Sequence, residues 1–187
     1  IALYAVTVFM ATGYYAGYSY IEPFLKEQAG MDNSLVTASL MLFGMAGILG
    51  SVAFSRYYTR NRYAFNTCCF IVIGACIALL LPVSGSIPVT LLLLGLWGMV
   101  GTAFNIAMQS EIINIAPPEG TSVTMSIFSG IFNFGIGTGA FIGGMVCRHI
   151  GLPHIGTVGG IIGVGTLLFW LLWQQKHLKA FYLGRSN

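Results

Sequence analysis

The side chains in this sequence that could do chemistry are a few polar residues set inside long apolar stretches. Tyr14, Tyr18 and Glu22 follow one another at intervals of four, so on a helix they would share one face. Asn105 and Gln109 have the same spacing in a later stretch. A polar side chain in apolar surroundings is costly, so these residues are expected to face protein or a water-filled cavity.

Asn133 is a further polar candidate, on a helix face that it would share with Ser126, Gly130 and Gly137. Hydroxyl and amide groups beside aromatic rings suit a neutral polyol such as a sugar, which forms hydrogen bonds at its edges and packs its faces on rings. The predicted substrate-binding residues are Tyr14, Tyr18, Asn105, Gln109 and Asn133. The alternatives are an interhelical hydrogen bond worth about 1 kcal/mol for Asn133 and a boundary aromatic belt for the outermost tyrosines.

Glu22 is the only Asp, Glu, Lys, Arg or His side chain within the long apolar stretches. It comes one residue before Pro23, at the end of the first stretch. This position suits either a solvated boundary residue or a role in proton coupling. Because we find no other carboxylate in these stretches, a proton-driven cycle would rely on residues outside this chain.

No metal or cofactor site is expected. Four cysteines, Cys68, Cys69, Cys76 and Cys147, fall inside apolar stretches, where cysteine behaves as a small apolar residue. The histidines and cysteines have no zinc-like spacing. An intramembrane enzyme would need paired acids, metal ligands or a nucleophile with a base, and no such set is recognisable. The polar residues are therefore interpreted as a binding site, not a catalytic one.

Six apolar stretches must position these residues. The 187 residues are 56% hydrophobic and 7% charged, whereas a soluble domain carries about 25% charged residues. Crossing a hydrocarbon core of about 30 Å takes about 20 helical residues, and a helix satisfies its own backbone groups there. We predict an all-α membrane protein with six transmembrane helices near 1–24, 34–54, 64–81, 88–110, 121–147 and 157–175.

The basic residues predict the orientation, because Lys and Arg are retained on the cytoplasmic side of a membrane. Six of the eight fall on one side of the predicted spans: Arg56, Arg60, Arg62, Lys176, Lys179 and Arg185. Both ends of the chain, including a tail at 176–187, are thus expected to be cytoplasmic. The connection at 111–120, which carries Glu111 and Glu119, should lie there too. Orientation accounts for the net charge of +3, so nucleic acid is not an expected partner.

The six spans divide into two groups of three. Because three is odd, the second group enters the membrane from the opposite side, as in transporters built from inverted repeats. Glycines at intervals of three or four inside the spans let helices approach closely, and both static packing and sliding during alternating access fit this pattern. Ile1 already lies in an apolar helix, without an initiator Met or a leader, so we expect a part of a longer polypeptide.

Three segments resemble a known family. Residues 18–25 read YSYIEPFL, residues 44–51 read GMAGILGS and residues 129–139 read SGIFNFGIGTG. In these segments the chain resembles bacterial sugar efflux transporters of the major facilitator superfamily, and the resemblance covers essentially the whole chain as helices seven to twelve. It implies proton-coupled export of sugars such as arabinose and thiogalactosides across the bacterial inner membrane. Export of drugs or nucleosides is the alternative within the superfamily.

The resemblance also implies roles for glycines and arginines. Four glycines reproduce the spacing of the antiporter signature, with Ala140 where its proline would stand: Gly135, Gly139, Gly143 and Gly144. The cytoplasmic loop signature survives as Gly50, Arg56, Arg60 and Arg62, without its Asp. The glycines are expected to serve helix packing or gating, and the arginines to gate the cytoplasmic side or only to fix the topology.

Four partners are expected: a small-molecule substrate, protons, membrane lipid and a missing amino-terminal half of six helices. A channel or a non-transporting membrane module is a less favoured interpretation, because it would require oligomers with closed symmetry around a pore.

Overall fold

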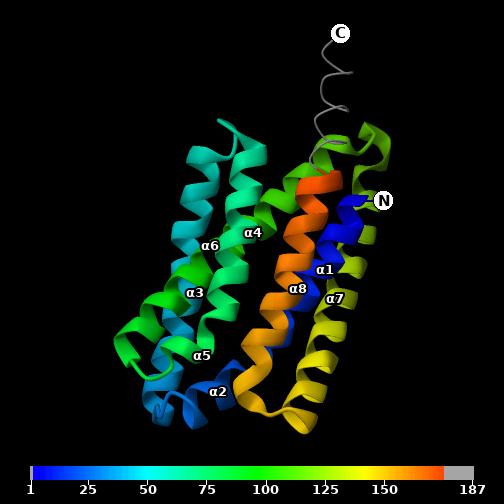
Figure 1. Cartoon of the computed structure of the whole chain (residues 1–187). Coiled ribbons are helices and arrows are strands. Elements are labelled where there is room, and N and C mark those ends of the chain that lie inside the picture. The colour runs from blue at the N-terminus through cyan, green and yellow to red at the C-terminus, as the bar shows by residue number, and fades with distance from the viewer. Residues whose placement is uncertain (1, 175–187) are drawn as a thin grey trace.

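The computed structural model describes residues 2–174, and the regular structure in that range is helical. The long helices are α1 (Ala2–Tyr18), α3 (Asn33–Tyr57), α4 (Arg62–Ala78), α6 (Ile87–Ile115), α7 (Thr121–His149) and α8 (Ile155–Phe169). The shorter ones are α2 (Ile21–Glu27), α5 (Leu80–Val83), η1 (Pro118–Gly120), η2 (Leu152–His154) and the π-helical η3 (Trp170–Gln174). Lys176, Lys179 and Arg185 lie outside the described residues. The predicted all-α membrane fold is confirmed (Figure 1).

Four helical segments are long and apolar enough to cross a membrane unaided: Asn33–Tyr57, Ile87–Ile115, Pro118–His149 and Leu152–Leu172. The other two spans are built from two pieces each. α1 and α4 have 17 residues, or roughly 26 Å of helix, and α2 and α5 continue them.

The first span is broken, which the sequence analysis did not predict. α1 ends at Tyr18, and α2 starts at Ile21 after a turn at Ser19 and Tyr20. Pro23 explains the break, because it has no N–H to donate to the carbonyl of Ser19 and its ring would clash with that carbonyl in a continuous helix. The prediction that Tyr14, Tyr18 and Glu22 share one helix face is therefore wrong.

The fourth span is longer than predicted. We expected it to end near residue 110, but α6 continues to Ile115 and stops before Pro117 and Pro118. Proline disfavours a helical conformation in the residue that precedes it, which accounts for this end. Glu111 therefore lies inside a helix and is fully buried, not in a cytoplasmic connection.

The helices are arranged as two trios, α1, α3 and α4 against α6, α7 and α8. The first helix of each trio packs along the second helix of the other, so α1 pairs with α7 and α6 pairs with α3. The third helices, α4 and α8, pack against each other behind α6 and α1. This packing of each trio's helices on those of the other is the arrangement expected of two inverted three-helix repeats.

Glycines bring the paired helices together. A Cβ on Gly135 would lie 2.6 Å from that of Ala11, and one on Gly139 would lie 2.5 Å from the carbonyl oxygen of Thr12. Further along α7, Gly143 and Gly144 leave room for the side chain of Tyr20, whose hydroxyl donates to the carbonyl of Ala140 at 3.2 Å. The predicted glycine stripe thus lies against α1. Whether the helices also slide along it stays a prediction.

Some glycines of α3 and α7 are not packed against another helix. A Cβ on Gly44 of α3, or on Gly130 or Gly137 of α7, would meet nothing within 4 Å. Large apolar side chains beside them are exposed, including Met45 at 67% and Phe134 at 67%. Within the described residues, α3 and α7 therefore each present an uncovered face that combines small and apolar residues.

Candidate functional site

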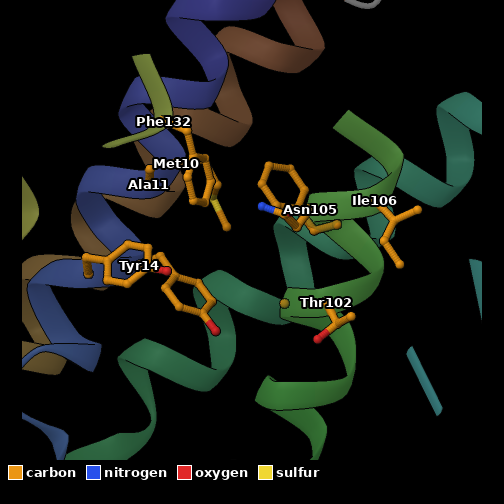
Figure 2. Close-up of a pocket in the computed structure, with 10 residues that line it drawn as sticks. Met10, Ala11, Tyr14, Thr102, Asn105, Ile106 and Phe132 are labelled. Atoms are coloured by element: carbon orange, nitrogen blue, oxygen red, sulfur yellow. The ribbon is translucent and has the colours of Figure 1, made fainter. Parts of the chain in front are cut away.

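A cavity of about 250 Å³ lies between α1, α6 and α7. Its lining is Met10, Ala11, Tyr14, Tyr15, Gly101, Thr102, Phe104, Asn105, Ile106 and Phe132 (Figure 2). Gly101 leaves room for the side chain of Tyr14 in this lining, because a Cβ there would lie 2.7 Å from the Tyr14 hydroxyl oxygen.

Two of the five predicted substrate-binding residues, Tyr14 and Asn105, meet in this cavity. They enter it from different helices, Tyr14 from α1 and Asn105 from α6 (Figure 2). Gln109 lies one turn further along α6, and its amide nitrogen donates a hydrogen bond to the amide oxygen of Asn105. This bond leaves the amide nitrogen of Asn105 as the end that enters the cavity. Gln109 thus positions Asn105 but is not part of the lining.

Aromatic rings form one wall of the cavity and continue beyond it. The ring centroid of Tyr14 lies 5.1 Å from that of Tyr15 and 5.2 Å from that of Trp97. Tyr18 does not line the cavity, but it packs 5.9 Å from Tyr14 and 5.1 Å from Phe43 of α3. Such edge-to-face and tilted pairs stabilise a packed aromatic cluster by about 1 kcal/mol each beyond area burial. Of the two predicted tyrosines, Tyr14 therefore lines the cavity, and Tyr18 supports Tyr14 from outside it.

Asn133 lies outside the cavity. Its side chain is exposed on α7, and its amide nitrogen donates to the carbonyl of Ser129 in the same helix at 2.8 Å. The face that it was predicted to share with Ser126, Gly130 and Gly137 exists, and all four residues are exposed. This face points away from α1, so the cavity receives its α7 contribution from Phe132.

Glu22 also lies away from the cavity. Its carboxylate pairs with Lys26 of the same short helix at 2.7 Å, and the Glu22 side chain is 58% exposed. The exposure agrees with the solvated boundary position, and a role in proton coupling stays a prediction.

Thr102 and Phe132 are lining residues that the sequence analysis did not select. Thr102 precedes Asn105 by three positions, so the helical spacing used for Asn105 and Gln109 would have found it. Phe132 is adjacent to Asn133, but the two side chains leave the helix on different faces. Only the packing of α7 on α1 decides which of the two enters the cavity.

A second polar cluster surrounds Glu111 at the end of the bundle that carries Arg56, Arg60 and Arg62, which we term the basic end. The Glu111 carboxylate accepts hydrogen bonds from the Tyr58 hydroxyl at 2.8 Å and from the Asn66 amide at 3.3 Å. Its other oxygen lies 3.8 Å from the guanidinium of Arg62, which also stands over the ring of Tyr58. The cluster therefore joins α3, α4 and α6.

This cluster changes the interpretation of the three arginines. The loop signature lacks its Asp, but Arg62 finds a carboxylate in Glu111 of α6. Arg56 and Arg60 are exposed and take no part in the described ion pairs. Glu111 is not among the predicted site residues, because its charge placed it in a predicted connection. The apolar residues Ile112 and Ile113 that follow it were the available sign that the helix continues.

Comparison with known proteins decides what kind of bundle this is. The family model described as Major Facilitator Superfamily matches residues 3–185. The chain belongs to the major facilitator superfamily. The two trios and the paired helices therefore belong to a fold of this superfamily.

Curated members of the superfamily include close relatives of the chain. It is 36% identical over 180 residues to the "Probable sugar efflux transporter" of Mannheimia succiniciproducens, covering 96% of this chain and 45% of that protein. It is also 36% identical over 189 residues to the "Probable sugar efflux transporter" of Pasteurella multocida, covering 100% of this chain and 46% of that protein. The chain thus spans about half the length of the curated relatives it matches.

Proposed function

We propose that this chain is the carboxy-terminal half of a proton-coupled secondary transporter that exports sugars across the bacterial inner membrane. The observation that carries the proposal is the cavity where Tyr14 and Asn105 meet beside aromatic rings, in a chain whose relatives are named sugar efflux transporters. A sugar hydroxyl can accept from the Asn105 amide or exchange hydrogen bonds with the Tyr14 hydroxyl. Its apolar ring face can pack on Tyr15 or Phe132.

The proposed transporter needs a second half, and two uncovered faces support this. Gly44 on α3 and Gly137 on α7 are open, and they lie on the helices that flank the cavity helices α6 and α1. Small residues let a partner helix approach closely, which stabilises helix association in membranes. An amino-terminal six-helix half docked on these faces would close the cavity from the opposite side. The cavity described above would then be one wall of the complete substrate site.

We propose that the cluster around Glu111 holds the basic end closed in one state of alternating access. Glu111 on α6 and Arg62 on α4 lie on different helices, so a shift of α4 relative to α6 would separate them. A buried pair of this kind favours the state in which it is formed, because separating it leaves a charge without its partner. The basic end is cytoplasmic in this proposal, since Arg56, Arg60 and Arg62 all lie there.

Export of drug-like molecules or nucleosides is the second candidate function. Met10, Phe104 and Ile106 give the cavity an apolar portion that a sugar would not fill by hydrogen bonding. A flat aromatic ligand could stack on Tyr15 or Phe132 instead.

The test is efflux of labelled arabinose and a labelled thiogalactoside from bacterial cells. The cells would express this chain alone or together with the amino-terminal half of a relative, with and without a proton gradient. We expect gradient-dependent efflux only in the cells that hold both halves. If the halves pair and insert but no sugar leaves, the sugar proposal fails, and the same cells would be assayed with drugs and nucleosides.

A further inference from the structure

A groove of about 530 Å³ lies on the back of the bundle, between the start of α4 and η3. Asn61, Tyr63, Thr67, Cys68, Ile71 and Leu171 are among its lining residues. The groove is separate from the cavity, because α4 and α8 pack behind α6 and α1 whereas the cavity is lined from α1, α6 and α7. It also lies away from the open faces of α3 and α7. In a membrane this side of the bundle faces lipid.

The polarity of the groove falls along its length. Asn61 and Tyr63 lie at the basic end, Thr67 lies one turn further, and Ile71 and Leu171 form the apolar part. From Asn61 to Ile71 the helix rises by roughly 15 Å. A ligand that fits this gradient has a polar head at the membrane boundary and an apolar chain that runs toward the bilayer centre.

The charge at the polar end specifies the head. Arg60 does not line the groove but directly precedes the lining residue Asn61; it is exposed, and the ion pairs described for residues 2–174 do not include it. The amide oxygen of Asn61 accepts from the backbone N–H of Ala64 at 3.1 Å, which leaves its amide nitrogen as the end that can donate. A guanidinium and an amide donor together favour an anionic head with acceptor oxygens.

We propose that this groove binds an anionic phospholipid of the leaflet at the basic end. The phosphate lies at Arg60 and Asn61, and one acyl chain follows Ile71 and Leu171. Basic pockets between transmembrane helices on the cytoplasmic side bind anionic headgroups for the same electrostatic reason. The lipid inference requires only that the basic end faces the cytoplasm, so it can fail or hold independently of sugar export.

The bound lipid would stabilise two contacts near the groove, a hydrogen bond and an ion pair. Thr67 accepts a hydrogen bond from the indole N–H of Trp170 at 2.9 Å, which ties η3 to α4 beneath the groove. Arg62, two residues from Arg60, forms the ion pair with Glu111. A lipid in the groove therefore contacts the segment that holds the buried cluster in place.

Native mass spectrometry of the purified 187-residue chain tests the inference, with phosphatidylglycerol and phosphatidylcholine in competition. We expect a preference for phosphatidylglycerol that Arg60→Gln reduces about fivefold, the usual effect of one basic residue near anionic lipid. Ile71→Trp fills the apolar part and should reduce binding of both lipids. Ile71 is 51% exposed, so the larger side chain has room without disturbing the core.

Matched controls separate the groove from general attraction. Arg56→Gln removes an exposed charge of α3 at the same end, and Ile161→Trp enlarges an exposed residue of α8. Both should bind as the unchanged chain does. Equal losses in Arg56→Gln and Arg60→Gln, or no lipid preference at all, would overturn the proposal. Stronger lipid binding by a chain that ends at Gln174 would also overturn the proposal. It would indicate that the residues after Gln174, not a lipid, occupy the groove in the full chain.

Discussion

The hydroxyl of Tyr58, at the end of α3, donates a 2.8 Å hydrogen bond to the carboxylate of Glu111 in α6. The bond is buried and links positions that are 53 residues apart. It holds two helices of different trios together at the basic end, where Arg62 and Asn66 complete the surroundings of the same carboxylate.

Glu111→Ala should destabilise the chain by about 2 kcal/mol, because it leaves the Tyr58 hydroxyl and the Asn66 amide buried without their acceptor. Loss of the partner of Arg62 adds to this cost. Thermal unfolding in detergent measures the change. Glu119→Ala is the control at the same end, since Glu119 is exposed and its replacement should stay within about 0.5 kcal/mol. Equal stability of the two variants would show that the cluster contributes nothing.

Gly139→Ala should destabilise the α1 and α7 pair, because the added Cβ would lie 2.5 Å from the carbonyl oxygen of Thr12 and neither backbone can yield alone. A loss of about 1 to 3 kcal/mol is expected for overpacking. Gly137→Ala, two residues earlier on the open face, meets nothing within 4 Å. It should stabilise the isolated chain by up to about 1 kcal/mol through helix propensity. Thermal unfolding of both variants would reveal any reversal of this order.

Gly44→Leu and Gly137→Leu should weaken capture of the amino-terminal half while leaving this chain folded. Both glycines are open in the described structure, and a leucine would keep a partner helix from approaching closely. Co-purification of a tagged amino-terminal half measures the loss. Gly165→Leu on α8 is the matched control, since Gly165 is equally open but lies on the back of the bundle. Loss of pairing in that control as well would assign the effect to insertion or folding.

Asn105→Ala should raise the half-saturating sugar concentration for efflux about tenfold, as expected for the loss of one substrate hydrogen bond of about 1.4 kcal/mol. Tyr14→Phe removes the hydroxyl and keeps the ring, so a smaller rise is expected. Efflux from cells that hold both halves provides the measurement.

Asn133→Ala belongs in the same experiment. An effect as large as that of Asn105→Ala would place Asn133 in the substrate pathway, facing the other half. Unchanged efflux would restrict its role to the hydrogen bond with the Ser129 carbonyl.

The sequence predicted the all-α membrane fold because hydrophobicity over about 20 residues is a property of composition. It also predicted the stripe of Gly135, Gly139 and Gly143, because helical spacing alone puts these residues on one face. Span ends were less accurate, since charges were used to mark them. Glu111 is charged and yet lies inside α6, where Tyr58, Arg62 and Asn66 compensate it. Those partners are distant in sequence, so no local pattern could reveal them.

The lining of the cavity was predicted only in part for a similar reason. Periodicity groups side chains by face, but it does not say which face a neighbouring helix covers. Tyr14 and Asn105 face the cavity, whereas Asn133 faces away from α1. The break at Ser19 and Tyr20 then removed Glu22 from the tyrosine face, although Pro23 was a visible reason for it.

Two tyrosines, one in α1 and one in the turn that follows it, fasten the first span to α7. The hydroxyl of Tyr4 donates to the carbonyl of Thr124, and that of Tyr20 donates to the carbonyl of Ala140, each at 3.2 Å. Both segments advance by the same 16 residues between these bonds, so the first span cannot slide along α7 without breaking one of them. The first span and α7 therefore behave as one rigid unit. In the proposed transporter half, relative movement of the first span and α6 would then occur where Tyr14 contacts Gly101, and a ligand beside Asn105 would lie between the two moving parts.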